Sequence, residues 1–186
     1  MANIARALEQ CRTGFSLSLS SDPAVIASAR KIVLPGVGSF AAARTWLAET
    51  KLDHAIRDAV ANGAFLLGIC VGHQLLFDSS DEMGVTPGLG LVRGDIRKME
   101  GALPVPQIGW NRVTARGPLF EGVESEAFYF VNSYAARGVS AEVATADYDG
   151  PFTAAVQQDR VFGVQFHPEK SSSAGLRVLR NFVACN

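Results

Sequence analysis

The sequence contains little cysteine, no basic block and no long apolar run. Three cysteines, Cys11, Cys70 and Cys185, are too few and too scattered in 186 residues for a disulfide framework or a metal cluster. Lys and Arg number 17 against 18 Asp and Glu, so the net charge is −1 and nucleic acid is not an expected ligand. No stretch approaches the ~20 apolar residues of a membrane span. Because no secretory signal opens the chain either, we expect a cytoplasmic location.

The composition is typical of a folded domain. Apolar residues make up 48% of the chain and charged residues 19%, a balance that argues against intrinsic disorder. A length of 186 residues lies within the usual ~100–200 residues per domain. We therefore expect a single domain over residues 1–186.

Helical spacing and short apolar runs alternate through the first half of the chain. In order, the pattern predicts a helix over 3–11, a strand over 15–19, a short helix over 22–29, a strand over 32–34, a helix that includes 52–60, a strand over 64–69 and a helix over 73–79. Continuous apolar strands between helices indicate a parallel sheet covered on both faces. Since a strand normally precedes the first helix of such a sheet, we expect this domain to lack its first strand.

The second half is richer in strands. Segments 90–98, 107–114, 126–134, 141–147, 152–157 and 161–166 have strand patterns, and a helix carrying Leu176, Leu179, Phe182 and Val183 ends the chain. The whole pattern predicts an α/β fold with a mixed, mostly parallel sheet and helices on both faces.

The segment Gly68-Ile69-Cys70-Val71-Gly72 lies where a buried strand is expected to meet a helix. It matches the Gly-x-Ser-x-Gly nucleophile elbow with sulfur in place of oxygen. The glycines permit a sharp turn, and the N–H groups that open the next helix favour a reactive thiolate. A small buried packing residue is the alternative for a lone cysteine, and it is the role we expect for Cys11 and Cys185.

A strand ending in His167-Pro168-Glu169 offers a base with a neighbouring carboxylate. Residues i and i+2 of an extended segment point the same way, and the proline keeps the residue before it extended. Glu169 can then bind one nitrogen of His167 and leave the other to exchange a proton with Cys70. A structural or solvent-facing histidine is the alternative interpretation.

The segment from Leu34 to Ser39, Leu-Pro-Gly-Val-Gly-Ser, follows another expected strand. Its two glycines free the backbone to present N–H groups to a developing oxyanion. A phosphate cradle is a competing interpretation, although the lysine of a P-loop and the third glycine of a dinucleotide fingerprint are missing. A plain turn is the simplest alternative. Thiol elbow, oriented imidazole and glycine loop together predict covalent acyl transfer through a thioester.

Taken together, the motifs resemble those of the class I glutamine amidotransferases, and among them the glutaminase subunits of imidazole glycerol phosphate synthase. The resemblance covers essentially the whole chain. The segments that carry it are Leu-Pro-Gly-Val-Gly-Ser-Phe (34–40), Gly-Ile-Cys-Val-Gly-His-Gln-Leu-Leu-Phe (68–77), Gly-Trp-Asn-Arg-Val (109–113), Tyr-Phe-Val-Asn-Ser-Tyr (129–134) and Gly-Val-Gln-Phe-His-Pro-Glu-Lys-Ser (163–171). Pro-Gly-Val-Gly and Gly-Trp-Asn indicate the histidine-pathway branch.

Carried over by position, this resemblance implies roles for single residues. Cys70 becomes the nucleophile, His167 the general base and then acid, and Glu169 the orienting carboxylate. The other implied roles are substrate binding by Gly36, Gln74, Ser133 and Tyr134, an oxyanion hole from Val71 with Val37 or Gly38, and a partner interface at Asn3, Trp110 and Lys170. The resemblance implies no cofactor and no metal.

The implied reaction hydrolyses L-glutamine to glutamate and ammonia through a cysteinyl thioester. A chain of this length has no room for a second catalytic domain that uses the ammonia. The resemblance implies a heterodimer with a (β/α)₈-barrel cyclase, which receives the ammonia and makes imidazole glycerol phosphate and aminoimidazole carboxamide ribotide. Neither nucleic acid nor membrane is an implied partner.

Several positions depart from the family pattern. Family members begin with an apolar strand and a glycine-rich turn that end near Asn3, so we expect a misplaced start or a truncation. Asn132 and Gln107 stand where the family usually has histidine. His73 replaces the usual methionine, and we expect a packing or capping role for His73.

Two alternatives to this function remain. One is a glutaminase for another synthase, of the anthranilate or pyridoxal phosphate pathway, and the other is a non-catalytic scaffold that keeps the fold.

Overall fold

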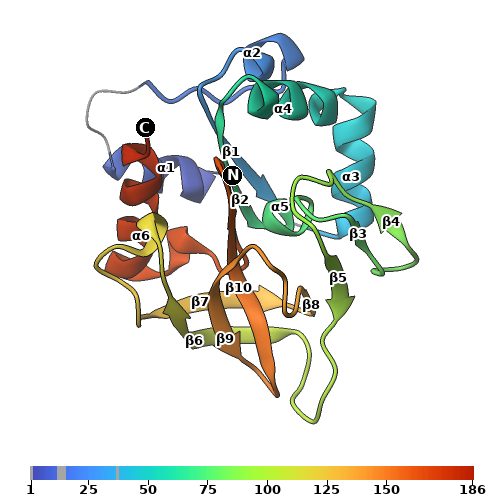
Figure 1. Cartoon of the computed structure of the whole chain (residues 1–186), viewed down its shortest axis with the longest axis vertical. Helices are drawn as coiled ribbons and strands as arrows, with labels where there is room; N and C mark the ends of the chain where they lie inside the picture. The colour runs from blue at the N-terminus through green and yellow to red at the C-terminus, as the bar shows by residue number, and fades with distance from the viewer. Residues whose placement is uncertain (1, 12–15, 37) are drawn as a thin grey trace.

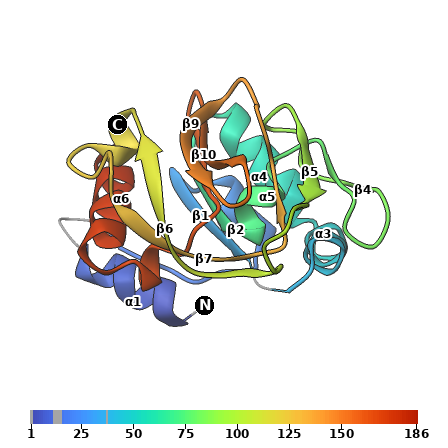
Figure 2. The same cartoon turned by 90° about the horizontal axis from the view of Figure 1, so that it is seen from below.

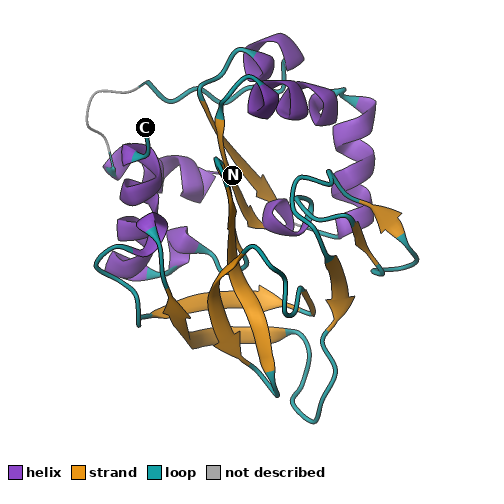
Figure 3. Ribbon diagram, in the orientation of Figure 1, coloured by secondary structure: helices purple, strands orange, loops and turns teal. Residues whose placement is uncertain are grey.

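A seven-stranded mixed sheet runs through the protein (Figures 1 and 3). The computed structural model describes residues 2–11, 16–36 and 38–186. In these residues the strand order of the large sheet is β1 (Lys31–Gly36), β2 (Phe65–Cys70), β11 (Val161–Val164), β10 (Pro151–Gln158), β9 (Glu142–Asp147), β6 (Gln107–Ala115) and β7 (Ala127–Asn132). A smaller sheet has the order β4 (Thr86–Pro87), β3 (Ser79–Ser80), β5 (Asp95–Lys98) and β8 (Tyr134–Ala135).

Strand direction divides the large sheet into two parts. β1, β2 and β11 are parallel, whereas the pairings β11–β10, β10–β9, β9–β6 and β6–β7 are antiparallel. The α/β fold with a mixed sheet is therefore confirmed, but the expectation of a mostly parallel sheet is wrong. In the described part of the large sheet only the β1–β2 and β2–β11 pairings are parallel, because the strand-rich second half adds its strands in antiparallel order.

Helices cover both faces of the parallel part (Figures 1 and 2). On one side lie α1 (Ala2–Gln10) and α6 (Ser172–Ala184), which contact each other. On the other side lie α2 (Pro23–Ala27), α3 (Phe40–Glu49), α4 (Leu52–Ala61) and α5 (Val71–Gln74). Two 3₁₀ turns, η1 (Pro118–Phe120) and η2 (Pro168–Lys170), complete the described elements. No helix in the described part of the chain combines the length and the apolar character needed to cross a membrane.

Local chemistry explains how the helices begin and what they bury. The Asp22 carboxylate accepts the Ala24 N–H at 2.9 Å, and Pro23 occupies the first turn of α2 as expected. In α6 the buried residues Gly175, Val178, Leu179 and Phe182 recur at helical spacing and face the sheet.

A cluster of phenylalanines lies beneath the strand end that carries His167. The rings of Phe128 and Phe166 stack with centroids 4.1 Å apart, and Phe120 and Phe130 meet Phe166 edge to face. All four side chains are fully buried. Because Phe166 directly precedes His167, this packing fixes the position of the imidazole's backbone.

The predicted helix over 73–79 is wrong beyond its first residues. α5 ends at Gln74, and the carbonyl groups of Leu75, Leu76 and Phe77 accept N–H groups from residues 89–92. Ser79 already belongs to β3. These carbonyls bond to a distant segment, which overrides the local helical pattern. Similarly, only residues 95–98 of the expected strand 90–98 form one.

The expected strand over 15–19 is also not formed in its described part, residues 16–19. Among the described residues no strand pairs with the outer edge of β1, and Leu19 is 73% exposed. A cavity of about 1310 Å³ separates residues of β1 from the helices α1 and α6 and from Ser16 and Ser18. Because residues 16–19 lie beside no described strand, their backbone has no partner for the hydrogen bonds of a sheet.

Candidate active site

Cys70 and His167 come from neighbouring parallel strands. Cys70 is the last residue of β2, and His167 follows β11 by three residues. The two strands pair in parallel, with Val164 opposite Ile69. Since parallel strands end at the same edge of a sheet, both side chains reach the same place, as in other open α/β sheets that bind ligands at their carboxyl edge.

Cys70 occupies a strained turn. Its φ is 55° and its ψ −113°, a region that non-glycine residues rarely adopt. Gly68 and Gly72 make the turn possible, because a Cβ on Gly72 would overlap the Leu34 carbonyl oxygen and one on Gly68 would lie 2.5 Å from the Gly72 oxygen. Cys70 is 7% exposed, and its sulfur lies 3.9 Å from the Val131 carbonyl oxygen.

The His167 ring is paired with a carboxylate. Nδ1 of His167 lies 3.0 Å from Oε1 of Glu169, and both side chains are about nine-tenths buried. Burial alone would lower the pKa of His167, but hydrogen bonds and charge interactions with Cys70 and Glu169 outweigh it and raise the pKa to about 9. Burial opposes ionisation of Glu169, yet the hydrogen bond from His167 holds the pKa of this carboxyl below its ordinary value. An imidazolium can therefore persist beside the thiol at neutral pH.

The backbone of His167 is held on both sides. Its N–H donates to the Tyr129 carbonyl at 2.8 Å, and its carbonyl accepts the Ser171 hydroxyl at 2.6 Å. The same Ser171 oxygen accepts the Tyr129 N–H at 3.0 Å. His167 itself is extended, with φ −98° and ψ 97°, as the following proline favours. Ser171 therefore links the backbones of His167 and Tyr129, a contact that the sequence motifs did not predict.

The glycine loop after β1 lies against the elbow. Gly36 is the register partner of Cys70, and a Cβ on Gly36 would overlap the Gly72 nitrogen. Gly38 has φ +89° and is exposed. Val37 lies outside the described residues. Val71 opens α5, so its N–H has no acceptor within the helix and can face an oxyanion.

Gln74 and Tyr134 lie together beside the elbow. The Gln74 amide nitrogen donates to the Tyr134 carbonyl and to the Gln165 side-chain oxygen, both at 3.0 Å. These bonds leave the Gln74 oxygen as the group that can accept a donor from a ligand. Ser133 joins β7 to β8, and its carbonyl accepts the Met99 N–H at 2.8 Å.

The sequence motifs did not predict a role for Gln165 in the site. It is fully buried, and it precedes His167 by two residues. The i, i+2 rule that paired His167 with Glu169 also places Gln165 on the His167 side, so this signal could have found it.

The two amide residues that replace histidines face each other. Gln107 and Asn132 are register partners in β6 and β7, and both are buried. The Asn132 amide nitrogen donates to the Tyr134 carbonyl at 3.2 Å and to the Met99 sulfur at 3.2 Å. Within the described residues, the side-chain oxygens of Gln107 and Asn132 find no hydrogen-bond partner. Such buried acceptors are typical sites for a bound water or a ligand donor.

His73 packs in the core. Its side chain is fully buried, and its ring meets Phe77 edge to face at 5.2 Å. A Cβ on Gly163 would overlap its Nδ1, so this glycine makes room for the ring. Burial lowers the pKa of His73 to about 3, so the ring is neutral at physiological pH.

The three residues expected at a partner interface are exposed. Trp110 on β6 is 55% exposed and meets Tyr129 edge to face at 6.1 Å. The Lys170 ammonium lies 5.6 Å from the centre of the Tyr129 ring. Asn3 lies on α1, which contacts the η2 turn that carries Lys170.

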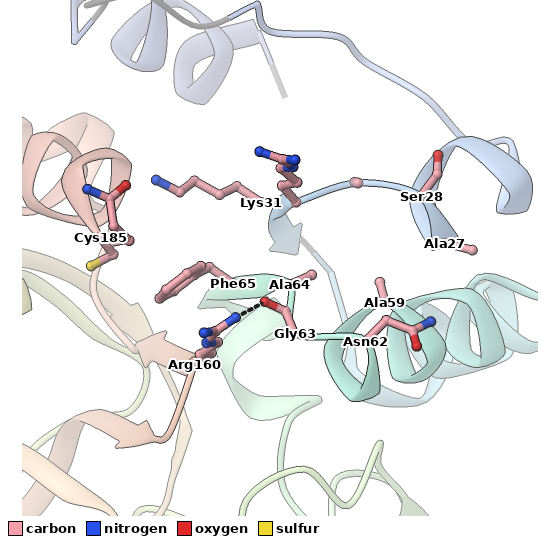
Figure 4. A pocket seen from close by; sticks show the side chains of 13 residues that line it. Ala27, Ser28, Lys31, Ala59, Asn62, Gly63, Ala64, Phe65, Arg160 and Cys185 are labelled. Carbon is pink, nitrogen blue, oxygen red and sulfur yellow. Dashed lines mark hydrogen bonds between the residues drawn. The ribbon is translucent and has the colours of Figure 1, made fainter.

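A separate cavity of about 560 Å³ opens at the amino ends of β1 and β2 (Figure 4). The Phe65 ring lies between the Lys31 ammonium and the Arg160 guanidinium, at 5.6 and 5.0 Å, and Arg160 donates to the Gly63 carbonyl at 2.6 Å. Burial raises the pKa of the Cys185 thiol that lines it. The cavity lies at the opposite end of these strands from Cys70.

The sequence matches the family described as glutamine amidotransferase class-I over residues 1–185. The chain belongs to this family. A subunit HisH of imidazole glycerol phosphate synthase from Caulobacter vibrioides is 47% identical over 174 residues, covering 89% of this chain and 82% of that protein. The HisH subunit from Symbiobacterium thermophilum is 44% identical and covers 98% of this chain and 89% of its own length. Within the family, the chain therefore groups with the HisH subunits.

A solved structure shares the fold. A crystal structure of glutamine amidotransferase superposes with a TM-score of 0.77 at 19% identity, covering 98% of this chain and 91% of its own. The structural likeness includes the arrangement of sheet and helices described above.

Proposed function

We propose that this chain hydrolyses L-glutamine to glutamate and ammonia, as the glutaminase subunit of an imidazole glycerol phosphate synthase. The observation that carries the proposal is the strained Cys70 at the end of β2, with the His167–Glu169 pair beside it on the adjoining strand end. A thiol with an oriented imidazole is the arrangement used for covalent acyl transfer. Its relatives carry the HisH name, which favours this branch over the anthranilate and pyridoxal phosphate alternatives.

The proposed reaction has two halves. The Cys70 thiolate attacks the side-chain amide carbon of glutamine, and the carbonyl oxygen becomes an oxyanion that accepts N–H groups of Val71 and of the Gly38 loop. His167 protonates the departing nitrogen, which leaves as ammonia. His167 then takes a proton from water, the hydroxide cleaves the γ-glutamyl thioester, and the thiol is restored as glutamate leaves.

Glu169 acts through the imidazole. Because its carboxylate occupies Nδ1 of His167, the remaining Nε2 is the nitrogen that exchanges a proton with Cys70. The charge of Glu169 also stabilises the imidazolium that the first half of the reaction needs.

Substrate binding falls to the residues beside the elbow. The side-chain oxygen of Gln74 can accept the α-ammonium group of glutamine, since its amide nitrogen already serves Tyr134 and Gln165. Gly36, Ser133 and Tyr134 border the same place from β1, the β7–β8 link and β8.

A partner subunit receives the ammonia in this proposal. We place a (β/α)₈-barrel cyclase against the face that carries Trp110, Lys170 and Asn3, where a half-exposed tryptophan and a lysine lie beside Tyr129. The complex works in the cytoplasm, whose reducing conditions suit the free thiols of Cys11, Cys70 and Cys185.

The direct test replaces the proposed nucleophile in the complex. Cys70→Ala is expected to abolish glutamate release from glutamine, while synthesis from added ammonia by the complex continues. Cys185→Ala is the matched control, because this thiol lies away from the elbow, and it should keep full activity. Glutamine turnover that persists in Cys70→Ala would rule out the assignment and favour a non-catalytic scaffold.

A further inference from the structure

A side-chain hydroxyl replaces one backbone hydrogen bond beside His167. The His167 N–H donates to the Tyr129 carbonyl at 2.8 Å. In a hydrogen-bonded pair of antiparallel strands, the facing residue would return a direct bond from its own N–H. Here the Tyr129 N–H donates to the Ser171 hydroxyl oxygen at 3.0 Å, and this hydroxyl donates to the His167 carbonyl at 2.6 Å. The Ser171 hydroxyl therefore bridges the second bond between the two backbones.

Ser171 occupies a position where serine usually has another task. It is the N-cap residue of the 13-residue helix α6, and its carbonyl accepts the Gly175 N–H at 2.9 Å. The side chain of an N-cap serine ordinarily accepts an N–H from the first turn of its own helix. Within the described residues the Ser171 side chain forms no such bond. Its hydroxyl is used for the contact between His167 and Tyr129 instead.

Close packing holds the Ser171 hydroxyl in place. Ser171 is fully buried. A Cβ on Gly175 would overlap the Pro168 carbonyl oxygen and would lie 2.8 Å from the Ser171 Cβ, so only glycine lets η2 pack this closely against α6. Turning the hydroxyl away would leave a buried donor without an acceptor, which is costly.

The same bond closes the turn that carries Glu169. This residue lies in η2, between His167 and Ser171, and its Oε1 lies 3.0 Å from Nδ1 of His167. The His167 carbonyl accepts the Lys170 N–H at 3.0 Å as well as the Ser171 hydroxyl. Ser171 therefore fixes both the backbone of the imidazole and the turn that presents its carboxylate.

We propose that Ser171 is a positioning residue for His167, and that its hydroxyl holds the imidazole toward Cys70. The inference rests on the proposed function, in which His167 exchanges a proton with Cys70. A hydroxyl suits this task because it can accept from one backbone group and donate to another at once. Without it the Tyr129 N–H loses its acceptor, and one bond instead of two joins His167 to Tyr129.

Removing the hydroxyl should slow turnover and spare substrate binding. Ser171→Ala is expected to lower kcat for glutamine in the cyclase complex about 10- to 100-fold, because general acid–base catalysis depends on the placement of the proton carrier. KM should stay within about twofold, since other residues are proposed to bind glutamine. Thr50→Ala is the matched control, because it also removes a hydroxyl that donates to a backbone carbonyl at 2.6 Å, and it should leave kcat unchanged. An unchanged kcat in Ser171→Ala would overturn the proposal.

A second variant grades the effect. Ser171→Cys keeps a weaker donor and acceptor in the same place, so its kcat should lie between those of Ser171→Ala and the wild type. Urea unfolding of each variant establishes that the assayed protein is folded. A kcat of Ser171→Cys below that of Ser171→Ala would contradict the role of the hydroxyl.

The pH dependence of Cys70 alkylation separates positioning from general damage. Iodoacetamide reacts with the thiolate, forming a carbon–sulfur bond as iodide leaves, and mass spectrometry of the Cys70 peptide follows the reaction. At pH 7 the thiolate is favoured by the imidazolium beside it, so Ser171→Ala should be alkylated more slowly than the wild type. At pH 10 a thiol ionises without this help, so the two rates should agree. Equal slowing at both pH values would overturn the proposal, because the whole elbow would then be disturbed.

Failure of this inference differs from failure of the proposed function. If Cys70→Ala abolishes hydrolysis and Ser171→Ala does not slow it, the function stands and only the role of Ser171 is lost. If the wild-type complex shows no Cys70-dependent hydrolysis, the function itself fails.

Discussion

Oε1 of Glu169 lies 3.0 Å from Nδ1 of His167, and the two side chains share a site that is about nine-tenths buried. This contact links the charge of the imidazole to the carboxylate two residues away. Its effect on the pKa of His167 can be measured directly.

Glu169→Gln should move the alkaline limit of activity to lower pH. Glu169 contributes a hydrogen bond and a charge to the interactions that raise the pKa of His167 to about 9, so their loss lowers this pKa. The imidazolium that protonates the departing nitrogen then disappears earlier as pH rises. The measurement is the pH profile of kcat/KM for glutamine, which in the wild type should decline near pH 9. Glu121→Gln, on the surface, serves as control, and an unmoved alkaline limb in Glu169→Gln would contradict the pairing.

His73 makes the fold sensitive to acid. The pKa of His73 is about 3 in the folded protein against an ordinary value of 6.5, so between these values the unfolded chain binds a proton that the folded chain does not. This contribution to stability is complete above about pH 6.5 and is lost as pH falls toward 3. Between pH 7 and pH 5 the loss should be about 2 kcal/mol.

The test compares urea unfolding at the two pH values. His73→Met removes the titrating ring from the core and should shrink the difference between pH 7 and pH 5. His54→Met changes an exposed histidine and should leave it as in the wild type. If the difference survives in His73→Met, the acid sensitivity has another source.

The backbone strain at Cys70 should appear as an inverted order of stabilities. Residues with a side chain in such a region cost about 1–3 kcal/mol, and glycine avoids most of this. The free energy of unfolding of Cys70→Gly should therefore be about 1 kcal/mol higher than that of Cys70→Ala. At Cys185, where φ is −57°, the order should be the usual one, with alanine at least as stable as glycine. Chemical denaturation of the four variants measures both orders, and equal stability of the two Cys70 variants would show that the turn is unstrained.

Trp110 should contribute to binding of the cyclase. A half-exposed tryptophan that is covered in a complex is a frequent source of binding energy. Trp110→Ala should therefore raise the dissociation constant for the cyclase about 10-fold or more. Trp46 is 48% exposed and belongs to α3, which lies on the face of the parallel strands opposite α1 and α6 (Figure 1), so Trp46→Ala is the control. Calorimetric titration with the cyclase distinguishes them, and equal effects would move the interface elsewhere.

The site residues could be located from the sequence because their motifs are local. The glycines around Cys70 specify a turn, and the proline after His167 specifies an extended residue, so each motif carries its own backbone geometry. Their meeting also follows from sequence, since two buried strands of a parallel sheet end at one edge.

Features that depend on distant contacts could not be located in this way. The carbonyl groups of residues 75–77 accept hydrogen bonds from residues 89–92, so α5 is only four residues long. Residues 16–19 alternate like a strand but find no neighbour. The bond between Glu82 and Phe40 joins residues 42 positions apart, and no motif in the sequence connects them.

In the described part of the chain no strand pairs with the outer edge of β1, and an edge of this kind favours association at high concentration. The unpaired N–H and C=O groups of an edge strand can form hydrogen bonds with any extended segment, including a locally unfolded segment of another molecule. Such intermolecular strand pairing is a common start of aggregation. In an aggregated sample the measured turnover would reflect only the protein that is still unaggregated. Light scattering before each assay detects such aggregates.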